Sequence, residues 1–220
     1  MKRIFFCAFI LFSLFFVSCS PKISIQPKTN NQIFISFSTN FSNKGTKALK
    51  EIIGAVGDSE NSEKVELLSS KELKLILENI GLQNVISSVS KENSINGSGY
   101  LQNINSNFFN KIGILNLTNS SITFSLTPSK IQQFYDSLDE EGQGYLDLLM
   151  IPCLTGETST VTEYQELLSS IYGKELADEI INGKMYINLI SPDGSKTNKI
   201  QINLGEVFTL SSDKTWSLNW

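Results

Sequence analysis

Two stretches of the sequence place a serine three positions before a lysine, which is the spacing found in serine acylases. They run from Ser88 to Lys91 and from Ser211 to Lys214. In those enzymes the serine opens a helix, and S-D-N and K-T-G motifs supply further residues of the site. Neither companion motif occurs here and neither serine precedes a helical pattern, so the spacing does not predict a serine hydrolase.

Carboxylates are the other side chains whose clustering could serve catalysis. Four of them fall between Asp136 and Glu141. A pair drawn from Asp136, Asp139 and Glu157 could act as general acid and base in a hydrolase. A calcium site needs six to eight oxygen ligands, and the EF-hand spacing is absent. We therefore interpret the cluster as a solvated helix face, and we predict neither a metal site nor another cofactor.

Histidine is missing from all 220 positions. Its absence excludes Ser-His-Asp and Cys-His catalysis and removes the commonest ligand of zinc, copper and iron. The net charge is −4 and no basic run occurs, which disfavours nucleic acid as a partner. Gly97 with Gly99, and Gly142 with Gly144, lack the third glycine of a dinucleotide-binding loop, so we interpret both pairs as turns or flexible loops.

The sequence contains three cysteines. Cys7 lies inside an apolar N-terminal segment, Cys19 directly follows that segment, and Cys153 is flanked by apolar residues. If the segment is removed and Cys19 is modified, only Cys153 keeps a free thiol, so no intramolecular disulfide is expected. A free cysteine usually behaves as a small hydrophobe. We predict that Cys153 is buried and unreactive.

The first residues have the composition of a secretory signal. Lys2 and Arg3 precede an almost unbroken apolar run from Ile4 to Val17, which ends in small residues. The run is shorter than the roughly 20 residues that span a bilayer. Segment 1–18 is therefore predicted to be a cleaved signal peptide and is left out of the expected fold.

At the end of this segment, Phe16, Val17, Ser18 and Cys19 resemble the lipobox of bacterial lipoproteins, in a loose form similar to that of spirochaetes. The resemblance implies a thioether-linked diacylglycerol on Cys19, usually with an N-linked acyl chain such as palmitate, and attachment to a membrane of the cell envelope. Acyl chains contribute about 0.8 kcal/mol per buried CH₂, so several of them anchor a protein stably. Cleavage after Ser20 is the alternative, and it would release a soluble secreted binding protein.

The remaining chain is long enough for one domain. Residues 19–32 are interpreted as a lipidated N-terminus and tether, and residues 33–220 as a single globular domain. Similar strand-then-helix patterns suggest a diverged strand-helix-helix-strand duplication, with pseudo-repeats 33–117 and 118–220. Alternating and 3.6-residue apolar patterns predict helices packed on a mostly antiparallel sheet, in an α/β or α+β fold.

The C-terminal part is expected to be β-structure. Residues 185–190 and 200–204 alternate on either side of a turn at Ser191–Gly194, which predicts a hairpin. Residues 207–210 and 216–220 suggest a second hairpin.

Residues 128–182 have the most regular helical pattern, with breaks near Gly142 and at Gly173. The apolar faces of such helices must be covered by the sheet, a ligand or a bilayer. A candidate apolar binding surface is formed by Phe134, Tyr164, Leu168 and Ile171. The alternative is that these side chains belong to the core.

Together these features favour a non-enzymatic envelope protein, held at a membrane by lipid on Cys19, that binds a protein, a lipid or the membrane surface. The competing hypothesis is a tethered hydrolase built on the carboxylates named above. An exposed apolar groove would support the first, and a cleft with paired buried carboxylates would support the second.

Overall fold

The computed structural model describes residues 20–28, 32–40, 42, 69–79, 81–90, 94–102, 112–136 and 159–220. The predictions for Cys19 and Cys153 lie outside these residues. The described strands are β1 (Lys22–Pro27), β2 (Gln32–Asn40), β3 (Leu82–Ser90), β4 (Ser94–Gln102), β5 (Leu115–Leu117), β6 (Ser121–Leu126), β7 (Lys184–Ile190), β8 (Thr197–Asn203) and β9 (Lys214–Asn219). The described helices are α3 (Ser70–Asn79), α5 (Pro128–Asp136), α7 (Val161–Tyr172), α8 (Lys174–Asn182) and α9 (Leu204–Phe208).

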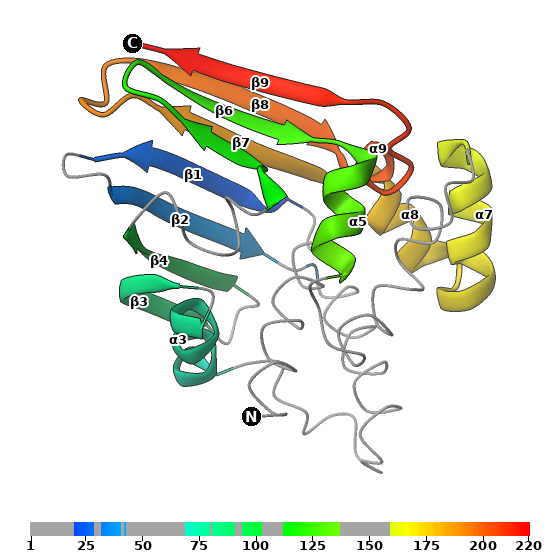
Figure 1. Cartoon of the computed structure of the whole chain (residues 1–220). Helices are drawn as coiled ribbons and strands as arrows, with labels where there is room; N and C mark the ends of the chain where they lie inside the picture. Colours follow the sequence, from blue (N-terminus) through cyan, green and yellow to red (C-terminus); the bar gives the residue numbers. More distant parts are fainter. Residues whose placement is uncertain are drawn as a thin grey trace.

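The strands form two sheets (Figure 1). The larger has the order β3-β4-β2-β1-β7-β8, and the smaller has the order β5-β6-β9. Every pairing is antiparallel except that of β1 with β7, which is parallel. The expected fold class, helices with a mostly antiparallel sheet, is confirmed as α+β.

Strict alternation of side chains gives the larger sheet two unlike faces. On β2, Ile33, Ile35 and Phe37 are buried, whereas Phe34 and Ser36 between them are partly exposed. Successive side chains of a strand point to opposite faces, and β4, β7 and β8 alternate in the same way. One face of the sheet therefore lies against the core, and the other carries mainly polar side chains.

The core lies between the apolar face of the larger sheet, the smaller sheet and the helices. One continuous cluster joins Ile187 and Leu189 of β7 to Ile122 of β6, Leu73 of α3 and Ile180 of α8, all at most 1% exposed. In Figure 1, α3 lies over β3 and β4, while α7 and α8 lie at one end of the sheets. Trp216 and Trp220 are partly buried against this cluster.

Helices α5, α7 and α8 lie within residues 128–182, where the sequence predicts helical structure. Thr127 caps α5, since its Oγ1 accepts a hydrogen bond from the N–H of Lys130 at 3.1 Å. Thr160 caps α7, and Glu163 completes a capping box. Gly173 has φ +82° between α7 and α8, a left-handed conformation that favours glycine. The predicted glycine break is therefore a sharp junction between two helices.

The interpretation of residues 19–32 as a tether is wrong for the six residues that form β1. Residues Lys22–Pro27 form β1, which lies inside the larger sheet between β2 and β7. Ile23 and Ile25 alternate with polar neighbours, and this period of two is the signature of a strand with one face in the core. The fold therefore begins only three positions after Cys19.

Two further expectations differ from the structure. The proposed repeats are not arranged alike in the described residues, since β2 and β3 of the first half share one sheet, whereas β6 and β7 of the second half belong to different sheets. Residues 207–210 do not form a strand with 216–220. Val207 and Phe208 belong to helix α9, and β9 pairs with β6. The hairpin of β7 and β8 is confirmed.

Candidate functional site

The outward face of the larger sheet carries small polar side chains in register. Strand pairing places Ile86 opposite Ser98, Ser98 opposite Ser36, Ser36 opposite Ser24, and Ser24 opposite Asn188. Neighbouring strands are about 4.8 Å apart, so these five side chains form one line across β3, β4, β2, β1 and β7. We call this line the serine row.

A second line runs beside the first, displaced from it by two residues on each strand. It contains Ser88, Asn96, Ser38, Lys22 and Tyr186, on the same five strands. Two residues of a strand span about 6.7 Å, so the two lines are neighbours on one face. We call this second line the lysine row.

The two rows line an open pocket of about 370 Å³. All of the serine row and all of the lysine row except Tyr186 contribute to it, and the remaining lining comes from Phe37, Ser87 and Gly97. Among the described residues that line the pocket there is no carboxylate and no thiol. Lys22, at the start of β1, is the one charged side chain in this described lining.

Several polar groups of the pocket have no partner among the residues that the structure describes. The hydroxyls of Ser36, Ser38 and Ser98 make no hydrogen bond to any residue that the structure describes, and Lys22 makes no ion pair there. By contrast, Ser24 accepts a hydrogen bond from Nδ2 of Asn188 at 3.2 Å. The unengaged hydroxyls are free to bond to water or to a ligand.

Ile86 reaches this face because of a bulge in β3. Leu82 is buried and lies an even number of positions from Ile86, so an uninterrupted strand would place both in the core. The register instead shifts between Gln83 and Ile86, and Asn84 has φ +53°. The extra residue reverses the alternation, as a bulge does, and leaves Ile86 73% exposed at the end of the serine row.

An aromatic pair borders the serine row on the side away from the lysine row. Phe34 of β2 and Tyr100 of β4 have ring centroids 5.2 Å apart with an interplanar angle of 55°. The ammonium of Lys28 lies 5.9 Å from the centroid of the Phe34 ring, within the range of a cation–π contact. The face thus combines hydrogen-bonding groups with adjacent apolar surface.

The side chains of this face have groups that can bind a polar or anionic ligand. Hydroxyls and amides donate and accept hydrogen bonds, and the ammonium attracts an anion. Among the described lining residues, Lys22 is the side chain of a type that can also serve as a general acid or base. The site can hold a polar ligand through hydrogen bonds and through the charge of this ammonium.

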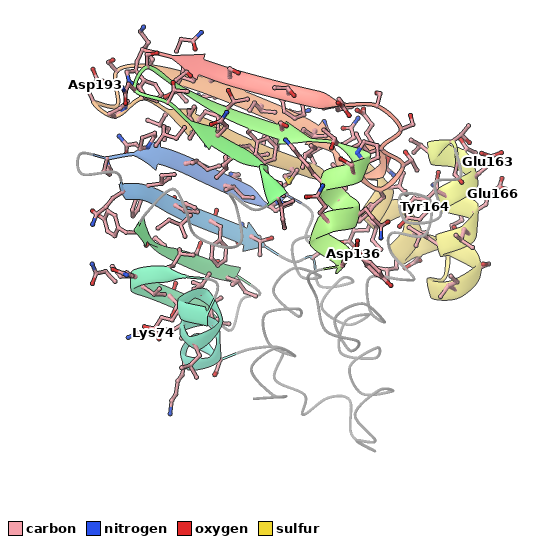
Figure 2. All side chains as sticks on the ribbon, in the orientation of Figure 1. Lys74, Asp136, Glu163, Tyr164, Glu166 and Asp193 are labelled. Atoms are coloured by element: carbon pink, nitrogen blue, oxygen red, sulfur yellow. The ribbon has the colours of Figure 1, made fainter. Side chains whose placement is uncertain are left out.

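The candidate apolar surface on the helices is largely core. Tyr164 and Leu168 are 1% and 0% exposed, and the Tyr164 ring lies 5.8 Å from that of Phe208 on α9. Figure 2 shows Tyr164 on the inner side of α7, with Glu163 and Glu166 on its outer side. Ile171 is 41% exposed. Phe134 belongs to α5, and its side chain lies outside what the structure describes.

The carboxylates proposed for a hydrolase do not form a described site. Asp136 is exposed at the end of α5, where it accepts a hydrogen bond from Gln132 at 2.8 Å (Figure 2). Asp139 and Glu157 lie outside the described residues. Within the described residues, no group of three or more His, Cys, Asp and Glu side chains could hold a metal ion.

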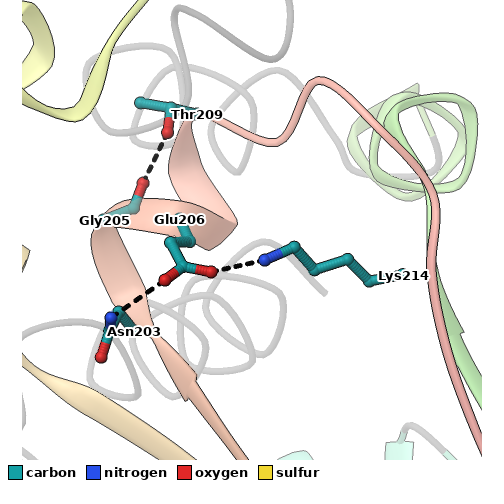
Figure 3. A network of polar contacts seen from close by, with 5 residues as sticks. All are labelled: Asn203, Gly205, Glu206, Thr209 and Lys214. Atoms are coloured by element: carbon teal, nitrogen blue, oxygen red, sulfur yellow. Dashed lines mark hydrogen bonds and ion pairs between the residues drawn. The ribbon is translucent and has the colours of Figure 1, made fainter.

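The Ser211–Lys214 spacing has a structural role. Lys214 donates a hydrogen bond to the carboxylate of Glu206, which also accepts one from Asn203 at 3.0 Å (Figure 3). The contact with Lys214 lowers the pKa of Glu206, against the opposing effect of burial. The lysine is thus engaged with a carboxylate that joins α9 to β9, and it does not contact Ser211.

One serine–lysine contact was not expected from the sequence. Lys130, in the first turn of α5, donates a hydrogen bond to the hydroxyl of Ser125 at the end of β6. Such pairs serve some hydrolases as nucleophile and base. Ser125 is only 8% exposed and does not line the pocket described above. The pair therefore satisfies a buried hydroxyl at the β6–α5 junction.

Gly97-Ser98-Gly99 lies within β4, not in a turn. A Cβ atom at Gly97 would lie 2.4 Å from Cε1 of Phe37, and one at Gly99 would lie 2.9 Å from Cδ2 of Leu82. The two glycines therefore serve packing on the core side of the strand, while Ser98 between them points to the opposite face. Alternation of glycine and serine was the signal in the sequence that could have revealed this.

Comparison with known proteins gives no relative for this chain. No family model, no curated protein and no solved structure matches it. Among the described residues, no helix is long and apolar enough to cross a membrane.

Proposed function

We propose that this protein is a lipid-anchored, non-enzymatic binding protein of the bacterial cell envelope, and that it holds its ligand on the serine and lysine rows. The observation that carries the binding part is the set of hydroxyls on Ser36, Ser38 and Ser98 that have no partner in the described residues. Polar side chains kept unpaired in a line across adjacent strands are suited to a polar ligand.

The anchoring part rests on the signal and on Cys19, which resemble those of bacterial lipoproteins. Lipid on Cys19 would keep the protein at a membrane and would hold β1 close to it. Residues 19 to 22 span at most about 11 Å. The ligand would then be one that is present in the envelope near the membrane surface.

Metabolic labelling with a palmitate analogue tests the anchor. The wild-type protein and a Cys153→Ser control should carry the label, whereas Cys19→Ser should not. Mass spectrometry of the mature N-terminus provides a second measurement. Equal labelling of wild type and Cys19→Ser, or a mature chain beginning after Ser20, would show that the protein is not anchored through this residue.

Photo-crosslinking in intact cells tests the binding face. A photoreactive amino acid at Ser98, in the middle of the serine row, should give adducts of increased mass. The matched control carries it at Thr215, an exposed position on β9 outside the two rows. If Ser98 gives no more adduct than Thr215, ligand binding on this face is refuted.

A further inference from the structure

We propose that the ligand of this face is a saccharide chain bearing acidic groups, which lies across the strands along the two rows. This inference rests on the proposed function, because it names the ligand class of the same face. Three observations support it: the hydrogen-bonding groups, the apolar side chains beside them, and the charge.

The hydrogen-bonding groups match a ligand that both donates and accepts at many points. A serine hydroxyl donates one hydrogen bond and accepts up to two, and saccharide hydroxyls have the same dual capacity. Three hydroxyls, on Ser36, Ser38 and Ser98, have no described partner. An extended peptide would instead add to the edge of a sheet through its backbone, whereas the rows lie on the face of the sheet, and four of their five strands are paired on both sides.

The apolar groups beside the rows suit the C–H surfaces of sugar rings. Phe34 precedes Ser36 by two positions on β2, and Tyr100 follows Ser98 by two positions on β4, so the aromatic pair borders the serine row. Ile86, at 73% exposure, closes the end of that row on β3. A chain lying across the strands would meet hydroxyls below it and apolar side chains at its border.

The charge favours an acidic ligand over a neutral one. Lys22 makes no ion pair with a described residue, and the lining of the pocket contains no carboxylate. The whole chain has a net charge of −4, so the positive rim of the pocket is a local exception. Recognition of an anionic lipid surface depends on clusters of basic residues, whereas Lys22 is the one basic side chain in the described lining, which argues against the bilayer as the ligand.

Isothermal titration calorimetry on the purified mature protein tests the inference. The acidic probes are the hexasaccharides of polygalacturonate and of hyaluronan, and maltohexaose is the neutral probe. At least one acidic probe should bind the wild type more tightly than maltohexaose does. The Ser36→Ala/Ser98→Ala double variant should bind it about tenfold more weakly, since each lost hydrogen bond accounts for roughly two- to tenfold.

Two further variants make the result specific. Lys22→Gln should abolish the preference for the acidic over the neutral probe. Thr123→Ala/Ser217→Ala removes a hydroxyl pair of the same kind, 2.9 Å apart, from β6 and β9, and should leave binding unchanged. The inference is overturned if neither acidic probe binds, or if the control variant loses affinity as much as the serine variant does.

The origin of the adducts at Ser98 separates this inference from the proposed function. Adducts that contain saccharide support both. Adducts that contain only protein or lipid support a binding face but overturn the saccharide assignment. Binding to phosphatidylglycerol vesicles would have the same meaning if the Ser36→Ala/Ser98→Ala variant abolished it. The absence of any adduct overturns both.

Discussion

Gly97 on β4 lies directly beneath the ring of Phe37 on β2, and a Cβ atom at Gly97 would be 2.4 Å from Cε1 and 2.6 Å from Cζ of that ring. Leu77 of α3 would lie 2.8 Å away. The two residues are paired across the strands, so the glycine allows the phenylalanine and the helix to pack on this part of the sheet. On the other face of the same strand, Ser98 contributes to the pocket.

The first prediction concerns this contact. Gly97→Ala should destabilise the protein by about 1–3 kcal/mol, the usual cost of forcing an extra methyl group into a packed core. Urea unfolding followed by circular dichroism measures the change. Ser98→Ala, one residue further on but on the open face, is the control and should change the free energy of unfolding by less than about 0.5 kcal/mol. Equal effects would mean that the packing on β4 differs from that described.

The second prediction separates core from surface on α7. Leu168→Ala should lower the free energy of unfolding by about 2–5 kcal/mol, because it leaves a cavity at a fully buried position. Ile171→Ala, at a residue 41% exposed, should lower it by less than about 1 kcal/mol. The same urea titrations measure both. A small effect of Leu168→Ala would restore the idea that this side chain belongs to an exposed binding surface.

The third prediction concerns the turn between β7 and β8. The pKa of Asp193 is lowered from its ordinary 3.8 to about 2. The largest cause is the hydrogen bond from the hydroxyl of Ser191, and the N–H and hydroxyl of Ser195 add to it. A carboxylate whose pKa is depressed in the folded state stabilises it above the unfolded pKa, and this contribution is lost as the pH falls through the folded pKa. The stability that Asp193 provides should therefore disappear between about pH 4 and pH 2.

Unfolding midpoints in urea, measured from pH 5 to pH 2, test this dependence. The difference in stability between wild type and Asp193→Asn should be largest at pH 5 and should shrink as the pH falls, since Asn does not titrate. Glu163→Gln is the comparison. The pKa of Glu163 is also lowered, and the largest cause is the hydrogen bond from the backbone N–H of Thr160. A difference for Asp193→Asn that stays constant with pH would refute the proposed hydrogen bonds.

Local sequence patterns predicted many of the helices and strands, but not which strands pair with one another. The alternation on either side of the Ser191–Gly194 turn and the break at Gly173 were sufficient to place the β7–β8 hairpin and the junction of α7 with α8. The order of strands was not accessible, because β1 pairs with β7 across about 160 positions of sequence, and no local pattern specifies such a partner. The serine row exists only through the pairings among β3, β4, β2, β1 and β7, so it could not be inferred from the separate serines.

The wrong predictions rested on apolar patterns that were too short to identify the element. Ile23 and Ile25 alone carry the apolar alternation of β1, and the flanking prolines favoured an irregular segment. Val207 and Phe208 form part of a run too short to distinguish a strand from a helix. The bulge at Asn84 turned the side chain of Ile86 from the core face of β3 to its outward face.

The last prediction concerns the orientation of the sheet at the membrane. If Cys19 carries lipid, the start of β1 lies within about 11 Å of the anchored residue. Lys22 is paired with Tyr186, so the start of β7 should lie near the headgroups. The opposite end of β7 is about 20 Å further along the strand, since six residues separate Lys184 from Ile190. The strands would then extend outward from the membrane, and the two rows, which cross the strands, would run along its surface with the lysine row nearer to it.

Fluorescence quenching on vesicles measures this orientation. A fluorophore attached to a cysteine at Lys184, exposed at the start of β7, is compared with one at Thr197, exposed and paired with Ile190 at the far end. Cys153→Ser is included in both proteins, so that the introduced cysteine is labelled alone. With a nitroxide on the lipid headgroups, the label at position 184 should be quenched more strongly, because nitroxide quenching acts only over short distances. Cys19→Ser should remove quenching at both positions. Equal quenching of the two labels in the acylated proteins would show that the start of β1 is not the end of the sheet nearest the membrane.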